Sequence, residues 1–151
     1  MDIIRRNTDY ALRLMVNLAG RHGKGPVSSR VLADQGDVSY PLACKLMQKL
    51  NAAGLVQSQM GSKGGFSLGK APSEITLLDV VEVIQGRISV NSCLLDVDAC
   101  RWQSSCPVRV KLVKLQEYIE DFFKGVKLDQ LLDGTGPERK NKAGTIRKGQ
   151  R

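Results

Sequence analysis

The sequence has few aromatic residues, a single histidine and no long apolar run. Three Phe, three Tyr and one Trp stand among 151 residues, of which 42% are hydrophobic. That composition is typical of one ordinary globular domain, or of a small domain with an extension. No apolar run approaches the ~18 residues that cross a membrane, and residues 1–20 lack the layout of a secretion signal. We therefore expect a cytoplasmic protein with no membrane partner.

Residue patterns that most enzymes use for catalysis are also missing. The only histidine, His22, lies near the end of a predicted helix, and we find no nucleophile–base pair and no paired carboxylates in an apolar setting. The glycine-rich residues 61–65 lack the Gly-Lys-Ser/Thr ending of a P-loop. These absences argue against an enzyme.

Positive charge is unevenly distributed along the chain, whose net charge is +8. Residues 1–75 carry ten Lys/Arg against five Asp/Glu, residues 76–133 seven against nine, and residues 134–151 six against one. A basic N-terminal half suits a nucleic-acid binder, and equally well a solvated surface. Residues 134–151 are rich in Gly, Lys and Arg without periodicity, which predicts a disordered basic tail.

Three helical patterns come first. Thr8 is the expected cap of a buried helix over residues 9–19, and Ser28 or Ser29 the cap of a short helix over residues 30–35. After a tight turn, Ser39 is the expected cap of a third helix that Gly54 ends. Its buried stripe is Leu42, Leu46 and Leu50, and its outer face is polar and basic. A short helix, a tight turn and such an amphipathic helix predict a helix-turn-helix.

A β-hairpin is expected directly after the third helix. Residues 55–60 alternate like a strand, residues 61–65 form a glycine-rich turn, and residues 66–68 return as a second strand. A hairpin in this position is a wing, and Lys63 at its tip could approach the DNA backbone or minor groove.

Two further helices follow. Thr76 and Asp79 form a capping box that opens a helix ending at Gly86. Pro107 then begins the longest periodic segment, which ends at Gly125. Its apolar stripe exceeds what the upstream residues can easily cover, so a symmetric dimer is predicted. The stripe consists of Val108, Leu112, Leu115, Ile119, Phe122 and Phe123.

Three of the four cysteines lie in the loop between these helices: Cys93, Cys100 and Cys106. In a reducing compartment such a cluster favours metal binding or redox chemistry over a structural disulfide. Thiolates bind zinc and the iron of iron–sulfur clusters, and spacing alone does not choose between them.

Helix-turn-helix, wing, three cysteines and long helix, in this order, resemble the IscR/NsrR/RirA family of bacterial winged-helix regulators over residues 1 to about 133. The resemblance is carried by residues 8–13 (TDYALR), 54–56 (GLV), 61–70 (GSKGGFSLGK) and 71–81 (APSEITLLDVV), together with the cysteines. It implies a mainly α fold: a winged helix-turn-helix with a small β-hairpin wing and a long C-terminal dimerisation helix. It further implies a cytoplasmic homodimer that reads a pseudo-palindromic DNA operator. Cys93, Cys100 and Cys106 would hold an iron–sulfur cluster whose loss or modification changes DNA binding.

The resemblance leaves the fourth cluster ligand open. IscR-like members use a His shortly after the third cysteine, where this chain has residues 107–109, Pro-Val-Arg. NsrR-like members use an Asp of the partner subunit's first helix, and Asp9 occupies that place. Asp96, Asp98 or a small exogenous ligand are its rivals, and an acid in the first turn of a helix is also favourable by itself. Asp9 without a histidine favours a 4Fe–4S over a 2Fe–2S cluster.

The expected organisation is a DNA-binding domain over residues 1–86, a cysteine loop over 87–106, a dimerisation helix and terminal turn over 107–133, and the tail. The expected DNA contacts are Ser39, Tyr40, Pro41, Cys44, Lys45, Gln48, Lys49, Ser62, Lys63 and Gly64. Met60 replaces an Arg that many members carry before the wing glycines, and Cys44 replaces a Glu of IscR, so the operator sequence is not implied.

The leading hypothesis is a DNA-binding transcriptional repressor whose iron–sulfur cluster senses nitric oxide, iron or redox state. An alternative is the same DNA-binding dimer with zinc or redox thiols in place of a cluster. A small electron-transfer protein is a further alternative, which leaves the basic helix-turn-helix without a purpose.

Overall fold

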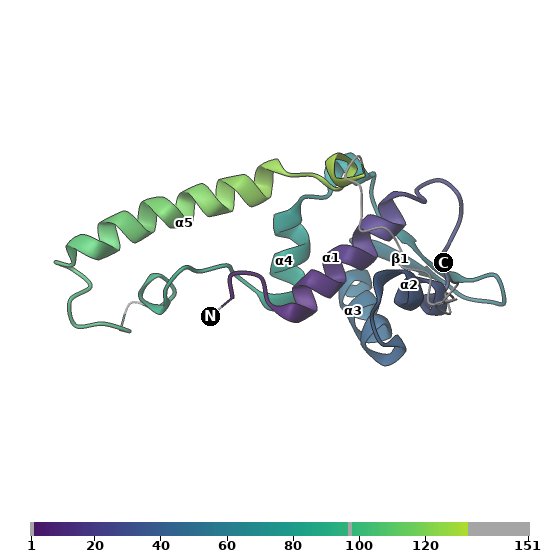
Figure 1. Ribbon diagram of the computed structural model, residues 1–151, viewed down its shortest axis with the longest axis horizontal. Helices are drawn as coiled ribbons and strands as arrows, with labels where there is room; N and C mark the ends of the chain where they lie inside the picture. Colours follow the sequence, from purple (N-terminus) through teal and green to yellow (C-terminus); the bar gives the residue numbers. More distant parts are fainter. Residues whose placement is uncertain (1, 97, 133–151) are drawn as a thin grey trace, which may run out of the picture.

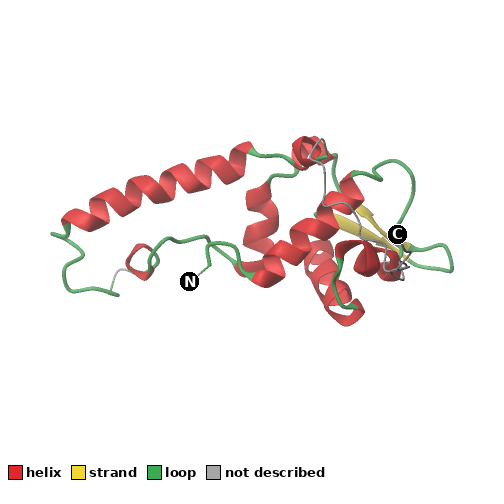
Figure 2. Cartoon of the chain, viewed as in Figure 1, coloured by secondary structure: helices red, strands yellow, loops and turns green. Residues whose placement is uncertain are grey.

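The computed structural model describes residues 2–96 and 98–132 and has the predicted winged-helix architecture (Figures 1 and 2). The expected tail, residues 134–151, lies outside the described residues. The long elements are α1 (Arg6–Ala19), α2 (Ser29–Gly36), α3 (Tyr40–Ala52), β1 (Val56–Gln59), β2 (Gly65–Leu68), α4 (Leu77–Gln85) and α5 (Pro107–Gly125). Short 3-10 turns are η1 (Pro72–Glu74), η2 (Ser92–Leu94) and η3 (Leu128–Leu131). None of the described helices is both long enough and apolar enough to span a membrane.

The start of α1 differs from the prediction. The helix begins at Arg6 rather than at residue 9, so Thr8 lies inside its first turn and is not its cap. The Thr8 side chain is fully buried, and its Oγ1 donates to Gln85 Oε1 at 2.7 Å. Gln85 Oε1 also accepts the Arg5 backbone N–H at 2.9 Å, and Gln85 Nε2 donates to the Ile3 carbonyl at 2.8 Å. A glutamine from the end of α4 thus holds the start of α1.

The first three helices pack together around the main core. Ser28 caps α2 as predicted, its Oγ accepting the Val31 N–H at 3.3 Å. Ser39 stands at the N-cap of α3, but its side chain makes no capping hydrogen bond, so that part of the prediction is wrong. Its hydroxyl therefore remains available on the surface. The most completely buried core side chains include Leu14, Met15, Leu18, Leu32, Met47, Leu50, Ile75, Val80 and Leu128.

The wing is a two-stranded antiparallel hairpin in which Val56 pairs with Leu68 and Gln59 with Gly65. Backbone crowding fixes its glycines. A Cβ on Gly64 would collide with the Gln59 carbonyl oxygen, and one on Gly65 with the carbonyl oxygen of Val27. Val27 and Phe66 exchange backbone hydrogen bonds of 2.8 Å in both directions, which tie the wing to the segment before α2.

The predicted capping box at the start of α4 is confirmed. The Asp79 N–H donates to Thr76 Oγ1 at 3.2 Å, and the Thr76 N–H donates to Asp79 Oδ2 at 2.8 Å. After α4, a second, smaller core includes Ile88 and side chains from α4, from α5 and from the segment before α1. Its members are Leu78, Val81 and Ile88, with Ile4, Ile119 and Phe123 packed against them.

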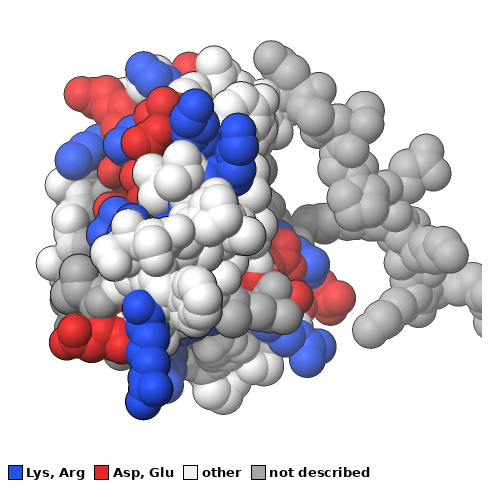
Figure 3. All heavy atoms as spheres, turned by 90° about the vertical axis from the view of Figure 1, so that its left-hand side faces the viewer, with Lys and Arg blue, Asp and Glu red and all other residues white. Residues whose placement is uncertain are grey.

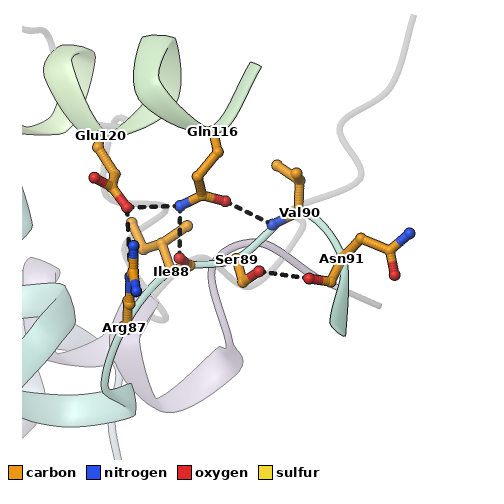
Figure 4. A network of polar contacts seen from close by, with 7 residues as sticks. All are labelled: Arg87, Ile88, Ser89, Val90, Asn91, Gln116 and Glu120. Atoms are coloured by element: carbon orange, nitrogen blue, oxygen red, sulfur yellow. Dashed lines mark hydrogen bonds and ion pairs between the residues drawn. The ribbon is translucent and has the colours of Figure 1, made fainter. Parts of the chain in front are cut away.

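Gln116 joins this linker to α5 (Figure 4). It is the one buried residue of α5, with 7% of its surface exposed. Its Nε2 donates to the Ile88 carbonyl at 2.7 Å and to Glu120 Oε1 at 2.8 Å, while its Oε1 accepts the Val90 N–H at 2.9 Å. Arg87 adds an ion pair to Glu120 at 3.7 Å. The chain entering the cysteine loop is therefore fixed to the middle of α5.

Helix α5 extends away from the body of the molecule, and only its C-terminal end returns to it (Figure 1). There the Leu77 N–H donates to the Val126 carbonyl at 2.9 Å, and the Leu128 N–H to the Ile75 carbonyl at 3.0 Å. The Leu128 side chain is buried in the main core. The rest of α5 contributes almost nothing to the core, which matches the expectation that its apolar side needs a partner.

Candidate DNA interface and cysteine loop

The outer face of α3 is polar and basic. The helix contains no Asp or Glu, and Lys45, Gln48 and Lys49 are exposed on it. Tyr40 is 45% exposed at its first position, next to exposed Ser39 and Pro41. Cys44 is half-buried, between the core face and the polar face. The candidate α3 residues are thus at least partly accessible, as an interface with DNA requires.

The tip of the wing is accessible as well. Ser62 and Lys63 are exposed, and Gly64 is half-buried against the backbone of residue 59. Met60, which precedes the tip, is 93% exposed. The wing therefore presents one cation and one long apolar side chain.

Sequence reasoning missed Arg30, which lies on the first turn of α2. Its guanidinium carbon lies 4.9 Å from the centroid of the Tyr40 ring, within the range of a cation–π contact. The two residues are on different helices, and the turn at Asp37 (φ 51°) brings them together. No local sequence signal marks such a pair.

The three clustered cysteines lie in a loop between α4 and α5, and the structure does not gather them around one point. Cys93 and Cys106 are half-buried and Cys100 is exposed. Within residues 2–96 and 98–132, no three His, Cys, Asp or Glu side chains form a group that could hold a metal ion. The loop is organised by Gln103, whose Nε2 donates to the Cys93 carbonyl at 3.1 Å.

The loop nevertheless has the chemistry that a thiolate-bound metal centre needs. Three soft sulfur ligands come from one segment, and two buried polar atoms near them, Gln103 Oε1 and Arg109 Nε, have no partner among the described residues. Unsatisfied buried polar atoms are rare and call for an explanation. Arg109 also supplies a positive charge three residues after Cys106, which suits an anionic thiolate centre. The ligand types therefore fit an iron–sulfur group, although the arrangement described does not assemble them.

Asp9, the candidate fourth ligand, is already engaged within its own helix. Its Oδ2 lies 2.7 Å from Arg13 Nη2, and both side chains are about half exposed. Arg13 and Arg6 also lie over the ring of Tyr10, at 5.4 and 5.7 Å from its centroid. The pair occupies Oδ2 and leaves Oδ1, the atom through which Asp9 would bind a metal of a partner subunit.

The apolar side of α5 is open to solvent. Tyr118 is 71% exposed and Phe122 is 57% exposed, and Val108 and Leu115 are exposed as well. Figure 3 views the end of the molecule to which the cysteine loop and the start of α5 extend, and shows a broad uncharged surface with charged groups mainly around it. A contiguous exposed apolar surface on a helix marks an interaction site.

Comparison with known proteins agrees with this architecture. The Rrf2 family model, described as an iron-dependent transcriptional regulator, matches residues 4–134. The HTH-type transcriptional regulator CymR of Bacillus subtilis is 30% identical over 130 residues, which cover 86% of this chain and 89% of CymR.

Solved structures are similar too. That of B. subtilis CymR, described as the global cysteine regulator, gives a TM-score of 0.76 at 28% identity, covering 90% of this chain and 100% of CymR. That of T. potens IscR gives 0.70 at 26% identity, covering 85% of each chain. An oxidised form of Staphylococcus aureus CymR gives 0.71 at 25% identity, covering 90% of this chain and 99% of the other.

The relatives are transcriptional regulators and not enzymes, in agreement with the fold and the basic α3 surface. The chain belongs to the Rrf2 family of winged-helix transcriptional regulators.

Proposed function

We propose that this protein is a cytoplasmic homodimeric repressor whose affinity for a pseudo-palindromic operator is controlled by an iron–sulfur cluster in the cysteine loop. The observation that carries the proposal is the direct succession of three cysteines and a helix whose apolar side has no partner. The loop, where the chemical change would occur, is therefore next to the surface through which two subunits would meet.

In the DNA-bound dimer, α3 enters the major groove. Lys45, Lys49 and Lys63 contact phosphates, and the side chains at the start of α3 lie near base edges. Support comes from the absence of acidic residues on α3 and the exposure of its lysines. The groove-facing set is Ser39, Tyr40, Pro41, Cys44 and Gln48, with Ser62 and Gly64 in the wing.

The dimer forms along α5, where Leu115, Tyr118 and Phe122 would become buried. Two recognition helices must match half-sites about one helical turn apart. Their separation depends on how α5 is held to the DNA-binding body, which is the role of Ile88 and Gln116. Those contacts lie a few residues before Cys93, so the order of the loop and the position of α5 are physically linked.

Cys93, Cys100 and Cys106 are the proposed cluster ligands, with Asp9 of the partner subunit as the fourth. When bound, an iron–sulfur group supplies iron that reacts with nitric oxide or oxygen and is lost under iron limitation. The iron-dependent description of the family supports this assignment. An oxygen ligand in place of histidine favours the 4Fe–4S form.

Anaerobic purification followed by iron, sulfide and zinc analysis and an absorption spectrum tests the proposal. Near-equal iron and sulfide with a broad visible band is the expected result. Asp9→Ala should alter that spectrum, whereas Asp2→Ala, an exposed acid outside α1, should not. Zinc alone, or no metal after anaerobic reconstitution, would overturn the cluster assignment.

A second candidate function keeps the DNA-binding dimer and replaces the cluster by zinc or redox-active thiols. It is favoured by the ungathered cysteines of the described residues and by the likeness to CymR, which has been solved in an oxidised form. The two candidates differ in one measurement. Reversible loss of DNA binding on oxidation of the metal-free protein, abolished by Cys93→Ser, Cys100→Ser and Cys106→Ser together, supports the thiol regulator.

A further inference from the structure

Arg30 and Tyr40 form a cation–π pair at the corner between α2 and α3. Arg30 comes from the first turn of α2 and Tyr40 from the first position of α3. The guanidinium carbon lies 4.9 Å from the ring centroid, and both side chains are exposed. The ring therefore holds the guanidinium on the surface of the helix-turn-helix.

The N–H groups of Arg30 remain unused. Asp34 lies one turn further along α2, yet the ion pairs within residues 2–96 and 98–132 are Asp9–Arg13 and Arg87–Glu120 only. In the same residues the guanidinium makes no hydrogen bond. A guanidinium that is held against a ring and has unpaired N–H groups is prepared for an anionic acceptor, because less side-chain entropy is lost on binding.

The position of the pair indicates which anion this is. In a helix-turn-helix the first helix crosses the DNA backbone and the start of the second reaches the groove. Arg30 belongs to the first of these helices and is held beside the start of the second. Lys45 and Lys49 continue the positive surface along α3. The nearby acids in the sequence are Asp34 on α2 and Asp37 in the turn that follows it.

We infer that Arg30 binds a phosphate of the DNA backbone at the edge of the major groove, and that Tyr40 is the platform that positions it. The inference rests on the proposed placement of α3 in the major groove. It assigns to Tyr40 a positioning role in addition to any contact with base edges. Guanidinium and phosphate match as a bidentate, charge-assisted pair.

The test compares Arg30→Gln, Arg30→Lys, Tyr40→Leu and Tyr40→Phe by fluorescence anisotropy over a range of salt concentrations. The probes are a mixed-sequence duplex of about 30 base pairs, enough for two half-sites, and the tightest duplex selected from a random pool. Lys124→Gln, which removes an exposed cation from the side of α5 opposite Phe122, is the charge control. Thermal unfolding confirms that each variant is folded.

Arg30→Gln should weaken binding to both duplexes by roughly tenfold and reduce the salt slope by about one. Arg30→Lys should keep the slope with a smaller loss. Tyr40→Phe should bind the mixed duplex as tightly as the wild type does. Adding Tyr40→Leu to Arg30→Gln should weaken binding little further, because Tyr40 acts through Arg30.

Each other outcome has a definite meaning. Binding of both duplexes by Arg30→Gln as tightly as by the Lys124→Gln control would overturn the inference. A loss confined to the selected duplex would make Arg30 a reader of bases and overturn the phosphate assignment. If the wild type binds neither duplex, it is the proposed function that fails.

Discussion

At the scale of single residues, buried hydrogen bonds between distant segments hold the two ends of the DNA-binding body together. Thr8 and Gln85 illustrate this. Thr8→Val keeps the shape of the side chain but removes the donor to Gln85 Oε1. We expect it to lower the free energy of unfolding by about 1–2 kcal/mol, as measured by urea denaturation. Thr8→Ser keeps the donor and should cost less. Equal losses in the two variants would show that the methyl group, not the hydrogen bond, matters.

A second residue-scale prediction concerns Gln116. Gln116→Leu leaves the Ile88 carbonyl and the Val90 N–H without their side-chain partner. Hydrogen exchange at the Val90 amide should become at least about tenfold faster, because local opening there loses its restraint. Glu117→Leu, an exposed neighbour on α5, is the matched control and should leave that amide unchanged. An unchanged rate in Gln116→Leu would mean that other contacts hold the linker.

The same residues show what sequence reasoning could and could not find. Thr76 and Thr8 were both predicted as helix caps. The prediction was right for Thr76, whose partner Asp79 is three residues away, and wrong for Thr8, whose partner is 77 residues away. Arg30 was missed for the same reason, since its partner Tyr40 lies across a turn. Local rules cannot identify contacts that the fold creates.

At the scale of secondary-structure elements, the wing depends on backbone contacts that only glycine allows. Gly65 has φ 153° and faces the carbonyl of Val27. Gly65→Ala should lower the free energy of unfolding by about 2 kcal/mol and weaken DNA binding through a displaced wing. Gly125→Ala, at the C-terminal end of α5, has space for a methyl group and is the control. Similar melting temperatures for both variants would contradict this view of the wing.

Most helix boundaries and the hairpin were predictable, because the signals that mark them, apolar periodicity and glycines, are local in the sequence. The cysteine loop was not. Its three cysteines are evident from their spacing, but the sequence carries no periodic signal for how residues 93–106 are arranged. In the described residues these cysteines do not form a metal-binding group, and their gathering around a bound cluster is part of the proposed function.

At the scale of the whole molecule, the exposed apolar side of α5 predicts that folding and association are linked. Leu115→Asp should give a monomer at concentrations where the wild type is a dimer, measured by light scattering after size-exclusion chromatography. Lys114→Asp places the same carboxylate on the polar side of the helix and should remain dimeric. The melting temperature of the wild type should rise with protein concentration. A monomeric wild type would refute the dimer.

Helix α5 is held at two points, and its N-terminal part extends beyond both. Its C-terminal end is bonded to the DNA-binding body through Val126 and Leu128, and its middle rests on Ile88 through Gln116. From Gln116 back to Pro107 the helix extends about 13 Å. A tilt of about 10° at Ile88 therefore moves the start of α5, and Cys106 with it, by about 2 Å. In the proposed dimer, small changes in side-chain volume around Ile88 would therefore alter the spacing of the two α3 helices.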